Sequence, residues 1–170
     1  MRFTACLALL ASLALASCVT TPQRKLSVAA PWVQSDAEFI FKDGSATITG
    51  QAFMRQQGGG VVTAAGDQVA LVPYTAYAEE RLRGIYRGGE FSAHDEAHVA
   101  VYPDVADYRH FKRQTTADST GRFTFKNITA GRYFIIAKVE WLVGNALQGG
   151  SLKKLVVVRQ DQTVDVILSQ

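Results

Sequence analysis

Cysteine is nearly absent from this chain, and the positions of the two that occur limit the chemistry of the protein. Both cysteines of the 170-residue sequence, Cys6 and Cys18, lie close to its start. The long remainder has no thiol for a disulfide, for a thiolate metal site or for a cysteine nucleophile. These three kinds of site are therefore excluded from the main body of the protein.

Long hydrophobic runs and a strong net charge are missing as well. After Cys18 no apolar stretch approaches the roughly 20 residues that a transmembrane helix needs. The chain has 18 Lys and Arg against 15 Asp and Glu, so its formal net charge is only +3. The basic residues are also scattered along the sequence, so nucleic acid is not an expected partner.

The sequence also lacks the common enzyme motifs. It contains no G-x-S-x-G nucleophile elbow. The glycine triplet Gly58-Gly59-Gly60 is not followed by the lysine and helix of a phosphate-binding loop. We therefore predict no enzyme activity and no cofactor.

The first residues carry a clear targeting pattern. Arg2 precedes an almost purely apolar run that ends in Leu15-Ala16-Ser17-Cys18. A run this short is typical of a secretory signal peptide, which we assign to residues 1–17. The ending L-A-S-C resembles the lipobox of bacterial lipoproteins. That resemblance implies a diacylglycerol on the Cys18 thiol, cleavage just before Cys18, and acylation of the new amine. An ordinary secretory signal is the alternative.

A lipidated Cys18 would attach the protein to a membrane without spanning it. One acyl chain gives only marginal membrane binding, whereas several chains on one residue make a persistent anchor. Val19 follows the cysteine, and the absence of an aspartate there favours the outer membrane. We expect a cell-envelope protein in which residues 18–34 form a tether and residues 35–170 form one domain.

β-Strand patterns dominate that domain. Apolar and polar residues alternate over 46–54, 122–126 and 164–168, and apolar runs cover 69–72, 133–139 and 155–158. Turn signals separate them, including Asp118-Ser119-Thr120-Gly121 and Gly149-Gly150. Short strands with such spacing predict an all-β fold, an antiparallel β-sandwich.

One stretch resembles a known family. Thr116-Ala117-Asp118-Ser119-Thr120-Gly121-Arg122-Phe123-Thr124-Phe125, followed by Gly131-Arg132-Tyr133, is similar to the T-D-x-x-G-x-F-x-F…G-x-Y signature of the carboxypeptidase regulatory-like domain. The resemblance implies a transthyretin-like (prealbumin-like) sandwich and an accessory, adhesive or carrier role. It also implies that Phe123 and Phe125 are structural core residues.

The sequence departs from that family over residues 73–114, which form a long insertion. This segment holds all three histidines and five of the six tyrosines of the chain. Apolar residues three and four positions apart predict a helix over 74–86, capped by Thr75 and stopped by Gly88-Gly89. Its apolar face is expected to pack on the sandwich, which makes the fold a β-sandwich with a partly helical insertion.

The histidines of the insertion suggest one alternative chemistry. His94, Glu96 and His98 could form a small metal-dependent hydrolase site, although the order differs from the zinc motif H-E-x-x-H. Two histidines four positions apart are about 6 Å apart on a helix but roughly 13 Å apart on a strand. The alternation that follows His98 fits a strand at least as well, so metal binding is not our leading hypothesis.

The leading hypothesis is a non-catalytic module that binds an envelope protein or a glycan. We expect its contact surface on the insertion, with Tyr74, Tyr77, Arg81, His94 and His98 as candidate residues. Another hypothesis is a subunit of an envelope secretion or assembly complex. Trp32 and Trp141 could stack on sugars, but Trp141 ends an apolar strand, which favours packing at the rim of the core.

Overall fold

The structure, a computed structural model, describes residues 24–94, 99–103 and 105–170. The signal peptide, the lipobox with Cys18, and two of the candidate metal ligands, Glu96 and His98, lie outside the described residues. No helix within the described ranges is long and apolar enough to cross a membrane.

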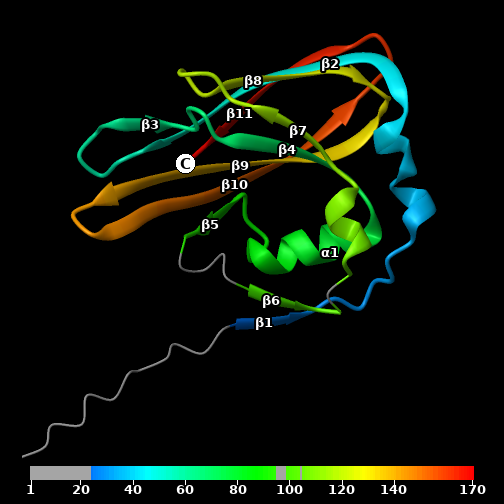
Figure 1. Cartoon of the computed structure of the whole chain (residues 1–170), viewed down its shortest axis with the longest axis horizontal. Helices are drawn as coiled ribbons and strands as arrows, with labels where there is room; N and C mark the ends of the chain where they lie inside the picture. Colours follow the sequence, from blue (N-terminus) through cyan, green and yellow to red (C-terminus); the bar gives the residue numbers. More distant parts are fainter. Residues whose placement is uncertain (1–23, 95–98, 104) are drawn as a thin grey trace, which may run out of the picture.

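Strands form most of the domain (Figure 1). In chain order the elements are β1 (Arg24–Ser27), η1 (Gln34–Asp36), η2 (Glu38–Phe41), β2 (Asp43–Arg55), β3 (Val61–Thr63), β4 (Gln68–Pro73), α1 (Ala76–Ile85), β5 (Phe91–Ala93), β6 (Val99–Tyr102), η3 (Asp107–His110), β7 (Arg113–Thr116), β8 (Arg122–Ile128), β9 (Gly131–Val143), β10 (Ala146–Val158) and β11 (Thr163–Ser169).

Two sheets pack face to face, as the sequence predicted. One has the strand order β5-β10-β9-β4-β7. In the other, β11 runs along one edge of β2, while β8 and β3 pair with successive parts of the opposite edge. Most neighbours are antiparallel, but β11 is parallel to β2 and β1 is parallel to β6.

The insertion and the N-terminal strand β1 together add two layers outside the five-stranded sheet. Helix α1 lies across the outer face of that sheet, and the small β1–β6 sheet lies beyond the helix (Figure 1). The strand β1 falls inside the segment 18–34 that we expected to be a tether, and Pro73 belongs to β4 rather than to the insertion. Pairing with a distant strand, which local sequence does not encode, accounts for the ordering of β1.

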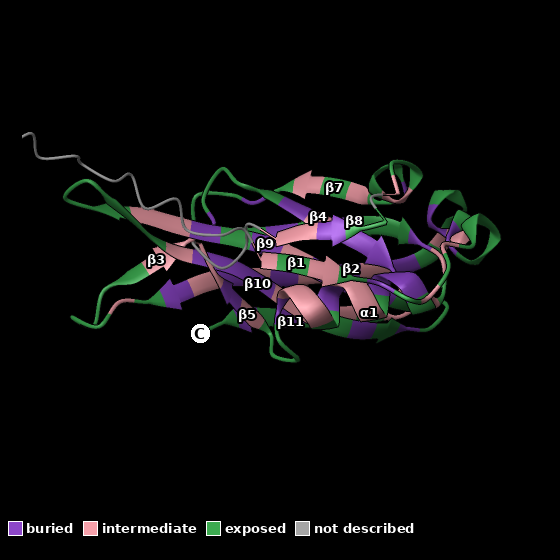
Figure 2. Cartoon of the chain, turned by 90° about the horizontal axis from the view of Figure 1, so that it is seen from below, coloured by how far each residue is buried: buried purple, intermediate pink, exposed green. Residues whose placement is uncertain are grey.

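Apolar residues fill each interface between layers. The largest cluster lies between the two sheets and includes Phe123, Phe125 and Tyr133. A second cluster joins the five-stranded sheet to α1, with Phe134 and Leu82 on opposite sides. Both faces of β4 and β9 are thus covered, which explains their continuous apolar runs. Figure 2 shows buried residues along the packed strands and exposed residues at the ends of the hairpins.

Local signals placed the Asp118–Gly121 turn and the helix correctly, although the turn joins two sheets, because β7 pairs with β4 and β8 pairs with β2. Asp118 accepts hydrogen bonds on Oδ1 from the backbone N–H groups of Thr120 and Arg122, and Gly121 has a φ of +77°. At α1, the Thr75 hydroxyl accepts a hydrogen bond from the Ala78 N–H at 3.0 Å. Both devices satisfy backbone donors with a nearby side chain, so they depend on sequence alone.

The prediction of a turn at Gly149-Gly150 is wrong. Both glycines lie inside β10, and the chain reverses instead at Gly144, where φ is +59°. Gly149 adopts a φ of +90°, and a Cβ there would lie 2.8 Å from the Trp141 ring and 2.1 Å from the Val139 carbonyl oxygen. The glycine therefore accommodates the indole of the neighbouring strand rather than a reversal of the chain.

Candidate functional site

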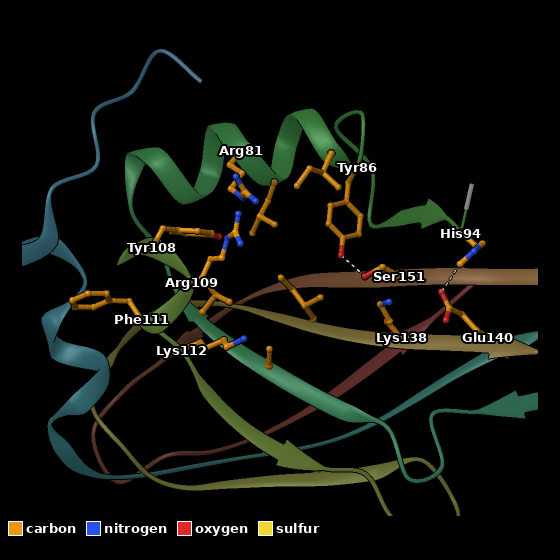
Figure 3. Close-up of a pocket in the computed structure, with 15 residues that line it drawn as sticks. Arg81, Tyr86, His94, Tyr108, Arg109, Phe111, Lys112, Lys138, Glu140 and Ser151 are labelled. Atoms are coloured by element: carbon orange, nitrogen blue, oxygen red, sulfur yellow. Dashed lines mark hydrogen bonds and ion pairs between the residues drawn. The ribbon is translucent and has the colours of Figure 1, made fainter. Parts of the chain in front are cut away.

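A cavity of about 390 Å³ opens between the insertion and the outer face of the five-stranded sheet (Figure 3). We call it the helix–sheet pocket. Helix α1 forms its roof, η3 and the residues after it form one side, and β4, β9 and β10 form its floor. The lining consists of Ala70, Val72, Arg81, Leu82, Ile85, Tyr86, His94, Tyr108, Arg109, Phe111, Lys112, Ile136, Lys138, Glu140 and Ser151.

The deep part of this pocket is apolar because of strand alternation. Residues at even positions of β9 point away from the sandwich core toward α1, so Ile136 joins Val72 of β4 on the floor. Leu82 and Ile85 reach the pocket from the helix above. An apolar floor with a few polar groups at its edge is typical of small-molecule binding sites.

Two tyrosines border the apolar floor, and both are held in the neutral phenol form. The Tyr86 hydroxyl lies 2.6 Å from the Ser151 hydroxyl, and burial raises the pKa of Tyr86 to about 12. Burial also raises the pKa of Tyr108 well above its usual value, despite the opposing effect of Arg81. Neither phenol is therefore suited to act as a base near neutral pH.

Positive charge dominates the remaining lining. Figure 3 shows Arg81 pointing down from α1 and Arg109 pointing up from η3, with Lys112 and Lys138 along the lower edge. The Arg81 guanidinium lies 5.1 Å from the centre of the Tyr108 ring, a distance that suits a cation–π interaction. Four cationic side chains thus surround one cavity, which favours an anionic ligand.

The far end of the pocket holds an ion pair. His94 Nδ1 lies 2.8 Å from Glu140 Oε1, and the two side chains are 31% and 24% exposed. Glu140 is the one carboxylate side chain that the described part of the chain contributes to this lining. Glu140 on β9, 46 positions further along the chain, therefore orients His94. The pair closes the pocket beside β5.

The structure places the candidate contact residues in different environments. Arg81 and His94 both line the helix–sheet pocket. Tyr74 lies outside it, where its ring faces the Arg132 guanidinium at 3.6 Å and its hydroxyl donates to Glu79. His98 lies outside the described residues.

Tyr77 was expected on the contact surface, and the structure contradicts this prediction. Its side chain is only 1% exposed, and its hydroxyl donates to the Pro103 carbonyl oxygen at 3.1 Å. It is buried because this face of α1 is covered by the β1–β6 layer, with Trp32 edge-on at 5.8 Å between ring centres. Tyr77 is therefore a core residue and not part of a contact surface.

The metal hypothesis gains no further ligand from the part of the chain that is described. Within it, no three His, Cys, Asp or Glu residues are grouped so that they could hold a metal ion. His110 lies on η3, and the two other expected ligands, Glu96 and His98, fall outside the described residues. The hydrolase alternative remains a hypothesis.

Sequence reasoning missed four of the residues that give the pocket its charge, namely Arg109, Lys112, Lys138 and Glu140. A signal existed for two of them. Lys138 and Glu140 interrupt the otherwise apolar β9 at alternate positions, which marks a polar segment of one strand face. Nothing local indicated that η3 and the short segment before β7 would bring Arg109 and Lys112 to that face.

Comparison with known proteins shows the fold. No family model matches the sequence, and no curated protein matches it. A solved structure from Pseudomonas aeruginosa, described as a proposed carbohydrate-binding protein, superimposes with a TM-score of 0.66 at 23% identity, covering 83% of this chain and 99% of that one. Identity at this level establishes a shared β-sandwich and nothing about the ligand.

Pilus proteins also match, but only in part. The major pilin subunit of Bacillus cereus has a TM-score of 0.42 at 14% identity, covering 74% of this chain and 30% of that one. The group B streptococcus pilus 2b backbone protein gives 0.36 and 12%, with 74% and 41% covered. The similarity to the Pseudomonas aeruginosa structure defines the class as a β-sandwich domain. In this chain a helix covers one sheet and forms the roof of a pocket.

Proposed function

We propose that this protein is a lipid-anchored module of the cell envelope that binds an acidic glycan in the helix–sheet pocket without transforming it. The observation that carries the proposal is the charge of the lining, in which Arg81, Arg109, Lys112 and Lys138 surround an apolar floor. Arginine and lysine bind carboxylate, sulfate and phosphate groups through charge-assisted hydrogen bonds. The carbohydrate-binding role proposed for the similar Pseudomonas aeruginosa protein supports a sugar as the ligand.

The size of the pocket also supports a small ligand. A volume of about 390 Å³ falls within the range of known ligand sites, roughly 300–1,000 Å³. The acid group of a sugar would meet the cations at the edge. The less polar ring face would lie over Ile136 and Val72.

The chemistry of the lining argues for binding without catalysis. Hydrolysis of a glycosidic bond usually requires two carboxyl groups on opposite sides of the bond. Among the described residues, the lining has only Glu140, which is paired with His94. The phenols of Tyr86 and Tyr108 stay protonated, since burial raises the pKa of each.

Calorimetric titration tests the proposed specificity. Tetragalacturonate should bind and its fully methyl-esterified form should not, because esterification removes the negative charges and leaves the sugar chain unchanged. Lys112→Gln and Lys138→Gln should each weaken tetragalacturonate binding by about tenfold, the usual loss for one charged hydrogen bond. Lys126→Gln is the matched control, because Lys126 is an exposed lysine of β8 in the other sheet. Equal binding of the two probes would refute the acidic-glycan proposal.

The lipid anchor is tested separately. Mass spectrometry of the mature protein should find acyl chains on Cys18 and no residue before it. Cys18→Ser should release the protein from the membrane fraction. An unmodified Cys18 thiol in the processed protein would contradict the anchor but leave the pocket unaffected.

A further inference from the structure

A second recess lies at the opposite side of β9 from the helix–sheet pocket. It is a groove of about 690 Å³ between the β2–β3 loop and the β9–β10 hairpin, and we call it the hairpin mouth. In Figure 1 both of these hairpins extend beyond the packed part of the sandwich in the same direction. Strand β4 pairs with β9 only as far as Ala137, so the end of β9 beyond this point is not covered by β4.

The two recesses are lined by neighbouring residues of β9. Glu140 lines the helix–sheet pocket, and Trp141 lines the hairpin mouth. Successive side chains of a strand point to opposite faces, so the two sites are separated by the sheet itself. A ligand in one recess therefore makes no contact with a ligand in the other.

Aromatic and amide side chains dominate the hairpin mouth. Trp141 and Phe91 are partly buried at the inner end, where both pack against the core between the sheets. Gln148 is the direct cross-strand neighbour of Trp141, so the two side chains share a face of the hairpin. Gln56, Gln57 and Gln170 line the opposite wall.

The walls of the mouth are held by backbone hydrogen bonds. The Gln56 N–H donates to the Gly60 carbonyl oxygen at 2.8 Å, which closes the loop after β2. The Arg55 N–H donates to the Gln170 carbonyl oxygen at 3.1 Å, which fixes the end of β11 beside this loop. On the other side, the positive φ of Gly149 leaves room for the Trp141 ring. The groove is thus a formed feature of the fold.

We infer that the hairpin mouth binds a neutral glycan chain. A neutral sugar has an apolar C–H face that stacks on an aromatic ring, and hydroxyl groups that both donate and accept hydrogen bonds. Each glutamine amide offers two N–H donors and one carbonyl acceptor, which matches adjacent hydroxyls. Arg55 is the one charged side chain among the described residues of this lining, in contrast to the four cations of the helix–sheet pocket.

The two tryptophans of the chain provide separate reporters. Trp141 lines the hairpin mouth, whereas Trp32 packs edge-on against Phe111 of the helix–sheet pocket at 5.3 Å between ring centres. Trp32→Phe therefore leaves Trp141 as the one tryptophan, and Trp141→Phe leaves Trp32. The indole Nε1 of Trp32 is buried without a hydrogen bond to any described residue, so Trp32→Phe breaks no hydrogen bond of this atom and keeps an aromatic ring beside Tyr77 and Phe111. Far-UV circular dichroism of the variant confirms that it is folded before it is titrated.

The test titrates the full chain carrying Trp32→Phe with maltohexaose, cellohexaose and chitohexaose while Trp141 fluorescence is recorded. At least one of these neutral probes should give a saturable change. Gln148→Ala in the same background should raise the apparent Kd about fivefold, the usual loss for a neutral hydrogen bond. Gln160→Ala is the matched control, because Gln160 is an exposed glutamine in the turn after β10.

The inference is overturned if none of the three probes changes Trp141 emission, or if Gln148→Ala and Gln160→Ala bind alike. A stronger response of Trp141 to tetragalacturonate than to the neutral probes would also overturn it. The protein carrying Trp141→Phe, with far-UV circular dichroism to confirm folding, reports on the helix–sheet pocket through Trp32. Failure of tetragalacturonate to change Trp32 emission would count against the proposed function alone.

Discussion

The tight turn at Gly121, between β7 and β8, allows a prediction that separates backbone strain from steric collision. Gly121 and Gly66 both have a φ of +77°, a conformation that side chains with a Cβ adopt only at a cost. A Cβ on Gly121 would lie 2.5 Å from the Ala52 carbonyl oxygen and 3.0 Å from the Thr63 Cβ. A Cβ on Gly66 would have no atom within 4 Å. Alanine at Gly66 therefore measures backbone strain, and alanine at Gly121 measures strain plus collision.

The expected magnitudes follow from these contacts. Left-handed backbone costs an alanine about 1–2 kcal/mol, partly offset by the reduced entropy of the unfolded chain, about 0.4–1 kcal/mol. Gly66→Ala should therefore lower the free energy of unfolding by at most about 1.6 kcal/mol. Gly121→Ala carries the same effect and an overpacking cost of about 1–3 kcal/mol, because the Ala52 carbonyl belongs to β2 and has little freedom to move.

Urea unfolding of the two variants and the unmodified protein measures both values. Gly121→Ala should be less stable than Gly66→Ala by about 1–3 kcal/mol, with a melting temperature lower by several degrees. Equal free energies of unfolding for the two variants would refute the collision with Ala52. Equal stability of all three proteins would refute the left-handed turn itself.

Three further predictions concern the helix, the pocket and the core. Thr75→Ala removes the hydroxyl that accepts from the Ala78 N–H and should lower the free energy of unfolding by about 1 kcal/mol, measured by urea titration. Because the folded pKa of Tyr86 is about 12 and the unfolded value is 10.0, its contribution to stability is complete below pH 10 and is lost between pH 10 and pH 12. Tyr86→Phe should make the loss of melting temperature over that range shallower, and an unchanged slope would contradict the assignment. Leu71→Ala should cost about 2–5 kcal/mol because Leu71 is fully buried, whereas the 42%-exposed Leu155 should tolerate alanine with a loss below about 1 kcal/mol.

The charge of the helix–sheet pocket shows why a site is harder to predict than a fold. Arg81 was a candidate because it lies in the insertion, where the contact surface was expected. Lys112 and Lys138 are far from it in the sequence and join it only in the folded chain. Tyr77 was a candidate that the fold buries. The helical pattern did not indicate that the β1–β6 layer would cover this face of α1. Both outcomes depend on contacts between elements that are distant in sequence.

Local interactions in this chain were readable from the sequence because they involve residues a few positions apart. The Thr75 cap, the Asp118–Gly121 turn and the alternation of Phe123 and Phe125 depend on backbone geometry and on the preference of apolar side chains for the interior. These features determined a β-sandwich with a helix attached. The tertiary structure alone decided the rest, namely the parallel pairing of β11 with β2, the ordering of β1, and the reversal at Gly144 in place of Gly149. In each case the deciding contact, such as the Trp141 ring against Gly149 or β6 beside β1, joins strands whose pairing no short stretch of sequence specifies.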